Sequence, residues 1–210
     1  MRTRSQAFPE VVMAGFCGQY SWISELEEKY VVPTISLIQG VECDEVIRRL
    51  GGDPAAVRSL TAVEAVELAD DSELVGVGQT GNTVYTIESV GYVAAVPGVV
   101  RDLSRGGRCF SVRFDVNGAD SVHYAVDGDL VVYEEHDGPV NPLRPDDPRW
   151  RTSWCDGLLD SEGRWGPNIL ALAEKVMGVP VQGSWFSEPL MTVELPSASS
   201  YVGTPYWDIP

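Results

Sequence analysis

The sequence predicts an α+β protein in which an antiparallel sheet carries its helices mainly on one face. The clearest observation is a meander of three short strands over about 108–135, joined by Asn117-Gly118 and Asp127-Gly128, dipeptides typical of tight hairpins. The second observation is that segments with helical spacing of apolar residues stand before and after this meander. Such a mixture of helices with antiparallel strands is typical of helices packed on a sheet.

The other elements follow from apolar spacing and from start and stop signals. Thr61 and Glu64 form a capping box that opens a helix. Pro33 and Gly51-Gly52 end two earlier helical segments. In chain order we expect a helix over 20–30, a strand over 34–38, a helix within 41–52, a helix from Thr61 to about Ala69, a hairpin around 79–82, a helix over 99–104, the meander, a helix over 167–177, a turn over 184–186 and a strand over 190–195.

Three glycines, Gly76, Gly78 and Gly81, have the G-x-G-x-x-G spacing of a nucleotide-binding loop. That loop requires a helix after it, whereas the residues that follow are rich in β-branched and aromatic side chains and predict a strand. A kinase-type loop requires a lysine on the next strand, and the chain contains only Lys29 and Lys175, neither in that setting. The glycines therefore predict a hairpin turn, and we expect no cofactor.

The register of the first meander hairpin is predicted from its apolar face. A loop of three residues sets Phe114 opposite Val122, and the apolar side chains of both strands then share one face. In this register His123 faces Arg113 on the polar side of the sheet, where the cation disfavours protonation of the histidine.

The order of the segments indicates one domain. Residues 1–18 show no clean period and are expected to form a loose arm, and residues 19–195 form the domain. A stretch rich in Pro, Asp, Arg and Trp, over 137–166, is expected to be a long loop across the sheet. The tail over 196–210 is expected to be an irregular strap.

Composition limits the class of partner. The chain of 210 residues has a formal net charge of −16, which argues against nucleic acid and leaves a basic protein as a possible partner. The longest apolar run, 90–100, is too short and too broken by Gly and Pro to cross a membrane. The N-terminus is a poor signal peptide, so we expect a cytoplasmic protein with reduced cysteines. The cysteines are Cys17, Cys43, Cys109 and Cys155.

Catalytic residues are not evident. The sequence has two histidines, and His136 lies beside Glu134, Glu135 and Asp137. This group is an alternative carboxylate or metal site, but the ligand spacing of a closed metal site is absent, and we expect no metal. Five of the six tryptophans stand at or after Trp150. Because tryptophan is favoured as an anchor at protein interfaces, we select as candidate partner-binding residues Trp150, Trp154, Trp165, Asp146 and Asp147.

Several segments together resemble an uncharacterised actinobacterial family, a domain of unknown function. They are Tyr20 with Trp22, "SLIQGVECDEVIRRLGGDP", "LTAVEA", "LSRGG", "FDVNG", "YAVDG" and "NILALAEKVMGV", and they span about residues 20–195. The resemblance implies a shared single-domain fold and a cytoplasmic bacterial setting, and it brings no catalytic residues. The stretch over 137–166 and the tail after Pro196 depart from the family pattern.

These observations favour a non-enzymatic acidic binding protein, of the kind that immunity proteins and antitoxins represent, with a basic protein as partner. Two alternatives stay open at this point. One is a small enzyme with a carboxylate or metal site near His136, and the other is a structural subunit of a larger assembly.

Overall fold

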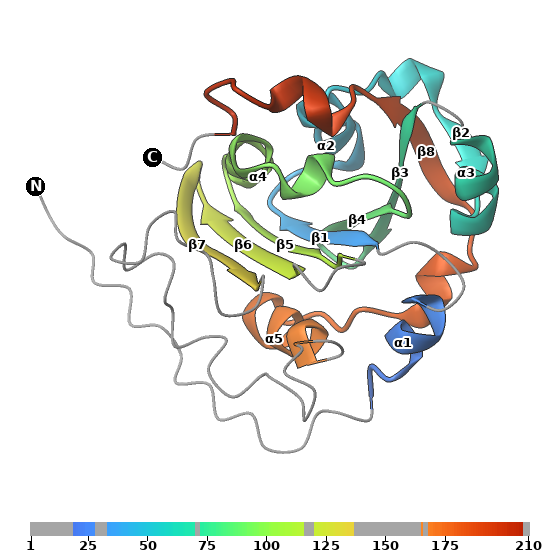
Figure 1. The fold of residues 1–210 in the computed structure, drawn as a ribbon, viewed down its shortest axis with the longest axis horizontal. Helices are drawn as coiled ribbons and strands as arrows, with labels where there is room; N and C mark the ends of the chain where they lie inside the picture. Colours follow the sequence, from blue (N-terminus) through green and yellow to red (C-terminus); the bar gives the residue numbers. More distant parts are fainter. Residues whose placement is uncertain are drawn as a thin grey trace, which may run out of the picture.

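Eight strands form one antiparallel sheet in the computed structural model of the protein (Figure 1). The structure describes residues 19–27, 33–69, 72–115, 120–136, 165 and 168–207. The strands are β1 (Thr34–Gln39), β2 (Arg58–Leu60), β3 (Glu73–Thr80), β4 (Thr83–Glu88), β5 (Arg108–Arg113), β6 (Asp120–Val126), β7 (Asp129–His136) and β8 (Leu190–Leu195).

The order of the strands in the sheet is β2-β8-β3-β4-β1-β5-β6-β7. The first strand in sequence, β1, therefore lies inside the sheet between β4 and β5. The last strand, β8, pairs with both β2 and β3, so the C-terminal part of the chain completes the sheet. The predicted α+β class is confirmed, and so is the meander of β5, β6 and β7.

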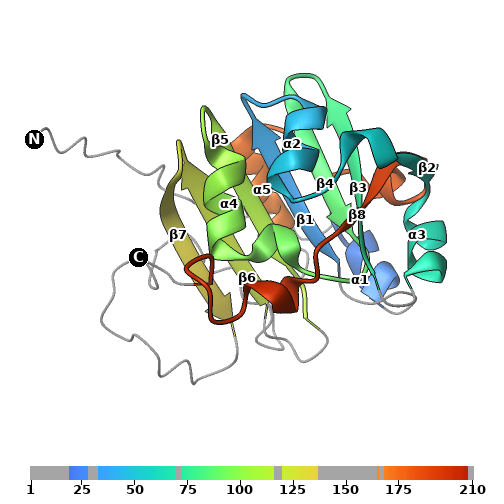
Figure 2. The same ribbon diagram turned by 90° about the horizontal axis from the view of Figure 1, so that it is seen from above.

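Helices cover both faces of the sheet, which corrects the expectation that they pack mainly on one. Figures 1 and 2 show α2 and α4 on one side and α5 on the other. The reason is that the inner strands are buried on both faces: all six residues of β4 are buried, whichever way they point. The helices are α1 (Trp22–Glu27), α2 (Cys43–Arg49), α3 (Ala62–Leu68), α4 (Pro97–Ser104) and α5 (Asn168–Met177), and the short 3₁₀ helices are η1 (Pro54–Ala56), η2 (Val93–Ala95), η4 (Gly183–Phe186) and η5 (Ala198–Tyr201).

Each face of the sheet has its own hydrophobic core. The core on the α5 side contains the buried aliphatic residues of α5 together with Ile35, Leu37 and Phe110 of the sheet. In this core the rings of Tyr85 and Trp185 stack with centroids 3.8 Å apart. The core on the other side joins residues of α2 and α4 to the strands and includes Ile38, Val46, Val99, Leu103 and Cys109.

Local signals in the sequence placed most turns and caps correctly. The capping box is present: the Thr61 N–H donates to Glu64 Oε2 at 2.8 Å, and the Glu64 N–H donates to Thr61 Oγ1 at 3.3 Å. The glycine hairpin joins β3 to β4 with a φ of 57° at Gly81. The turn between β6 and β7 has positive φ at both Asp127 and Gly128, which favours Asp-Gly.

The predicted register between β5 and β6 is wrong by two residues, although the faces are correct. Val122 pairs with Val112 instead of Phe114, and His123 therefore pairs with Ser111 instead of Arg113. The connection is longer than three residues because Asp120 closes it, with its Oδ1 accepting a hydrogen bond from the Asp115 N–H at 3.0 Å.

The described part of the tail contains η5 and continues as a strap over α4. The Gly98 N–H donates to the Tyr206 carbonyl at 2.8 Å, and the Tyr206 hydroxyl donates to Asp102 Oδ2 at 2.8 Å. A Cβ atom at Gly98 would lie 2.6 Å from Tyr206 Cα, so this close approach requires glycine. The arm over 1–18, and the loop over 137–166 apart from Trp165, lie outside the described residues.

Candidate functional site

Two rows of polar side chains cross the sheet on the face that carries α4. In β1, β4, β5 and β6 they follow from strand alternation, because each member lies an even number of residues from an apolar residue of the α4-side core on the same strand. In β7 a bulge shifts the register, and Tyr133 itself packs against that core. Cross-strand pairing aligns the members within each row. The first row is Thr86, Ser36, Ser111, His123 and Tyr133, and the second is Glu88, Thr34, Arg113, Ser121 and Glu135. We call these ten residues the polar band.

Glu88, at the end of β4, is the most buried ionisable group of the band, with 0% of its surface exposed. Its two oxygens accept hydrogen bonds from the backbone of η2: the Val93 N–H reaches Oε2 at 2.8 Å, and the Ala94 N–H reaches Oε1 at 2.7 Å. These N–H groups stand at the start of a helical turn, where no partner within the helix is available. The carboxyl group therefore caps η2 against the sheet.

Two further residues of the band hold the same segment. The Thr34 hydroxyl donates to the Gly91 carbonyl at 3.0 Å, and the Ser111 hydroxyl donates to the Ala94 carbonyl at 2.7 Å. The Ser36 hydroxyl in turn donates to Ser111 Oγ at 3.0 Å. The band thus satisfies backbone groups of residues 91–94, which would otherwise be buried without partners.

Burial changes the ionisation of the band. Burial raises the pKa of Glu88 to about 8, and the nearby Glu73 carboxylate raises it too, while hydrogen bonds from Ala94 and Val93 oppose the rise. Burial, assisted by the Arg113 guanidinium, lowers the pKa of His123 to about 3. The cation therefore disfavours protonation of His123, as the sequence predicted, although Ser111 is the cross-strand neighbour.

The band reaches the surface at Arg113. Its guanidinium bonds to Asp115 Oδ2 at 2.6 Å and lies 4.4 Å from the centre of the Tyr92 ring. Tyr92 makes an edge contact with Trp207 of the strap, with centroids 6.2 Å apart. The strap thus packs beside the outer end of the band.

Three buried side-chain atoms have no hydrogen-bond partner in the described part of the chain: Glu73 Oε2, Thr86 Oγ1 and His123 Nδ1. Thr86 and His123 are separated by the strands β1 and β5, so they do not converge on one point. The described contacts of the polar band hold a segment of the protein's own chain in place.

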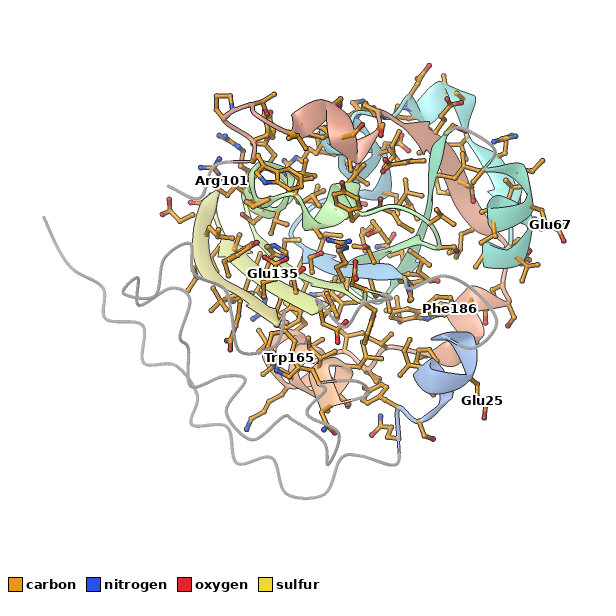
Figure 3. The ribbon with its side chains drawn as sticks, viewed as in Figure 1. Glu25, Glu67, Arg101, Glu135, Trp165 and Phe186 are labelled. Atoms are coloured by element: carbon orange, nitrogen blue, oxygen red, sulfur yellow. The ribbon has the colours of Figure 1, made fainter. Side chains whose placement is uncertain are left out.

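A second candidate lies at the other end of the sheet, on the outer face of α3. Val63, Glu64, Glu67 and Leu68 occupy positions i, i+1, i+4 and i+5 and therefore share one face of the helix. All four are exposed, with 36% of Val63 and 49% of Leu68 accessible to solvent. Figure 3 shows Glu67 on the outside of the molecule.

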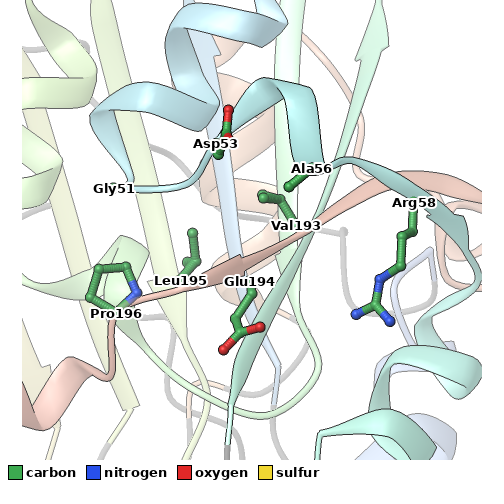
Figure 4. A pocket seen from close by; sticks show the side chains of 8 residues that line it. All are labelled: Gly51, Asp53, Ala56, Arg58, Val193, Glu194, Leu195 and Pro196. Carbon is green, nitrogen blue, oxygen red and sulfur yellow. The ribbon is translucent and has the colours of Figure 1, made fainter.

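A pocket of about 560 Å³ lies next to β2, between the C-terminal end of β8 and the segment of residues 51–58 that contains η1 (Figure 4). Strand β2 pairs with residues 190–192 of β8, so the following residues of β8, which pair with β3 on one edge, border the pocket on the other edge. The lining residues are Gly51, Asp53, Ala56, Arg58, Val193, Glu194, Leu195 and Pro196.

Of the residues that the sequence suggested for partner binding, the structure describes one. Trp165 is 3% exposed and lies in the core beside α5, so it is not available to a partner. Trp150, Trp154, Asp146 and Asp147 lie outside the described residues, as does the side chain of His136. Sequence reasoning missed Glu88 and the outer face of α3, although a Glu ending an apolar strand and aliphatic residues spaced beside carboxylates were visible signals.

Metal and thiol chemistry can be assessed for the described residues. Among them, no three His, Cys, Asp or Glu side chains gather in a way that could hold a metal ion. Cys43 and Cys109 are free, and burial raises the pKa of both thiols; Cys17 and Cys155 lie outside the described part.

No helix in the described part is long and apolar enough to span a membrane.

The fold and the site define an α+β protein in which one antiparallel sheet buries a polar band and carries an acidic outer helix. The chain belongs to the family of unknown function DUF6461, whose model matches residues 13–147. No curated protein and no solved structure matches the chain. The matched segment contains β1 to β7 but excludes α5 and β8.

Proposed function

We propose that the protein is a non-enzymatic binding protein that recognises a basic protein partner through the outer face of α3. The observation that carries this proposal is the combination, on one exposed helical face, of two aliphatic side chains and two carboxylates. Aliphatic groups supply contact area when they are covered, and carboxylates select a cationic partner. A helix that served only to cover the core would expose polar side chains here.

The charge of the described surface supports a basic partner. Carboxylates outnumber cations among the exposed side chains, and an excess of one charge accelerates the encounter with an oppositely charged partner at low salt. The exposed acidic residues are Glu25, Glu42, Asp44, Asp53, Glu64, Glu67, Asp127, Asp129, Glu188 and Glu194, and the exposed basic residues are Arg48, Arg58, Arg105 and Lys175.

The state of the interior also supports binding rather than catalysis. Glu88 and Ser111 are occupied by the backbone of η2, and His123 is buried and held neutral. Acid–base catalysis needs a titratable group within hydrogen-bond reach of a substrate. Groups that are covered by the protein's own chain do not offer that reach.

Within the class of binding proteins, we propose an inhibitory role of the immunity or antitoxin type. Such a role requires fast capture of a target, which a large excess of negative charge favours when the target is basic. We further propose that the protein acts in the cytoplasm, where the free thiols of Cys43 and Cys109 would stay reduced.

The test is capture of partners from a lysate of the protein's own host at low and high salt, with the tagged protein and two variants. Glu67→Lys reverses a charge on the proposed face, and lysine near the end of a helix agrees with the helix dipole. Asp129→Lys is the matched control, because Asp129 is exposed at the start of β7, at the opposite edge of the sheet.

We expect one basic protein to be retained at low salt and released at high salt. Glu67→Lys should abolish its capture, and Asp129→Lys should retain it. Equal capture by the two variants would contradict a role for α3, and the absence of a basic partner at both salts would contradict the proposed function.

A further inference from the structure

The carboxyl groups of Glu73 and Glu88, on the neighbouring strands β3 and β4, meet beside Gly91. A Cβ atom at Gly91 would lie 2.9 Å from Glu73 Oε2 and 3.2 Å from Glu88 Oε2, so the two oxygens flank one point. Glu73 Oε2 is buried and has no hydrogen-bond partner among the described residues. Neither carboxyl group forms an ion pair with a described residue. Two acidic groups therefore face each other in the interior.

The two carboxyl groups hold two different segments that cover the sheet. Glu88 accepts two N–H groups at the start of η2. Glu73 Oε1 accepts hydrogen bonds from the Ser197 hydroxyl at 2.8 Å and from the Ala198 N–H at 2.7 Å, at the start of η5. From η5 the chain runs on to α4 as the strap, as Figures 1 and 2 show. Glu73 thus fastens the beginning of the tail to the sheet, directly beside Glu88.

We propose that Glu73 and Glu88 form a pH-sensitive latch, which holds η5 and the strap in place while Glu88 is protonated and loosens them when Glu88 loses its proton. The physical reason is that two carboxylates at this separation repel each other, and burial leaves little water to screen them. Burial raises the pKa of Glu88 to about 8, and the Glu73 carboxylate adds to the rise. The charge of Glu88 therefore changes between pH 7 and pH 9.

Glu73 is the side chain that moves when both groups are charged. Glu88 is 0% exposed, and its ionised form binds the N–H groups of η2 more strongly than its neutral form does. Glu73 is only partly buried, so its carboxylate can turn towards water. That turn breaks its hydrogen bonds to Ser197 and Ala198. The tail after β8 then depends on the contacts of the strap with α4 alone.

Two other charged or titratable groups act on the pair. Arg113 of β5 favours the ionised form of Glu88, but it is ion-paired with Asp115 and remains a cation throughout. Tyr201 of η5 remains neutral, because burial raises its pKa, with the carboxylates of Glu73 and Glu88 as further causes. The remaining such residues of this neighbourhood contact the strap or Arg113, or lie beyond β5 in the sheet. They are Arg101, Asp102, Tyr206, Tyr92, His123 and Glu135.

The experiment measures how fast chymotrypsin cleaves the full-length protein after Tyr201 at pH 7 and at pH 9, with the cut sites identified by mass spectrometry. Cleavage requires this segment to leave its place in the fold. Each rate is divided by the rate for a free peptide of residues 196–207, which removes the pH dependence of the protease. We expect the relative rate to rise roughly tenfold, because the ionised fraction of Glu88 rises from about a tenth to about nine-tenths around its pKa of about 8.

Two variants remove the repulsion and keep a hydrogen-bond acceptor. Glu73→Gln retains an oxygen for Ser197 and Ala198, and Glu88→Gln retains one for η2. Each variant should show the same relative rate at the two pH values. Glu194→Gln is the matched control, since it removes an exposed carboxylate from β8, and it should keep the tenfold rise.

The comparison uses the ratio of the relative rates at the two pH values, so a constant loosening in a variant does not affect it. A flat ratio in the wild-type protein, or an undiminished rise in Glu73→Gln, would overturn the latch. An equal rise of cleavage after Phe110, which is buried in β5, would overturn it as well, because the whole protein would then be opening. If Glu88→Gln does not fold, the comparison with Glu73→Gln decides.

Discussion

The carboxyl group of Glu88 accepts a hydrogen bond of 2.7 Å from the backbone N–H of Ala94, and both residues are 0% exposed. This relationship joins the end of β4 to the start of α4, because η2 leads directly into that helix. An ionisable group at this depth is costly unless it is hydrogen-bonded. Glu88 is therefore a structural residue on which the cover of the sheet depends.

Glu88→Ala should lower the free energy of unfolding by about 2–5 kcal/mol, since it leaves the buried N–H groups of Val93 and Ala94 without an acceptor. Urea denaturation followed by circular dichroism measures the change. The control is Glu194→Ala on the exposed side of β8, which should change stability by less than about 0.5 kcal/mol. Equal effects of the two variants would refute the anchoring role of Glu88.

Stability should fall as the pH rises from about 6.5 to 8 because of Glu88. The pKa of Glu88 is about 8 in the folded protein and 4.5 as its ordinary value, so unfolding releases a proton in this range. The stability that the protonated Glu88 contributes is fully present below pH 4.5 and is lost as the pH approaches 8. One proton corresponds to a slope of about 1.4 kcal/mol per pH unit. Urea denaturation at several pH values measures this slope.

Glu88→Gln removes the titration while keeping an acceptor oxygen, so its stability should change little over the same pH range. The comparison uses slopes, which makes it insensitive to any constant loss of stability in the variant. A slope that is the same in both proteins would mean that another group titrates.

His123 should produce the opposite dependence at acid pH. Its pKa is about 3 in the folded protein against an ordinary value of 6.5, so unfolding takes up a proton between these values. Stability is therefore lost as the pH falls from 6.5 to 3. As the pH falls from 6.5 to 4.5, the stability lost through His123 is offset by the stability gained through Glu88. The effect of His123 is therefore clearest between pH 4.5 and 3, where Glu88 is mostly protonated in both states.

His123→Phe tests this dependence and preserves the shape of the ring, which packs edge-on against Tyr133 with centroids 4.7 Å apart. The variant should lose less stability than the wild-type protein between pH 4.5 and 3 in thermal melts. Identical acid profiles for the two proteins would show that His123 does not titrate as described.

Strong local signals in the sequence made the strands and helices predictable. The packing of helices on both faces of the sheet was not predictable. The strand Leu190–Leu195 and the capping box at Thr61 were placed correctly because each depends on adjacent residues. The two-sided covering of the sheet depends on β1 and β5, whose Ser and Thr residues look solvent-facing in sequence. Their burial becomes visible only when residues 91–94 lie across them.

Dependence on distant residues also explains why the candidate site was not predicted from the sequence. Polar alternation in β5 and β6 was visible, but the sequence could not show that hydroxyl groups there bind carbonyl groups of a distant loop. Strand β2 was missed because three residues with exposed or half-exposed side chains carry no periodic signal. The pocket depends on where β2 separates from β8, so it could not be expected either.

Residues 1–147, which end where the family match ends, should not fold on their own. Without β8, strand β2 loses its partner among the described strands and β3 becomes an open edge of that sheet. Without α5, the core on that side of the sheet loses its cover. The buried residues of α5 are Ile169, Leu170, Ala171, Leu172, Ala173 and Met177.

A buried aliphatic side chain contributes about 1.5–3 kcal/mol, so losing α5 and β8 together removes more than the 5–15 kcal/mol by which a domain is usually stable. We expect the truncated chain to show poor NMR dispersion and no cooperative thermal transition. Addition of a peptide of residues 165–207 should restore both, because it supplies α5, β8 and the strap. A cooperative transition of the truncated chain alone would mean that the matched segment is a complete domain, and that α5 and β8 are additions to it.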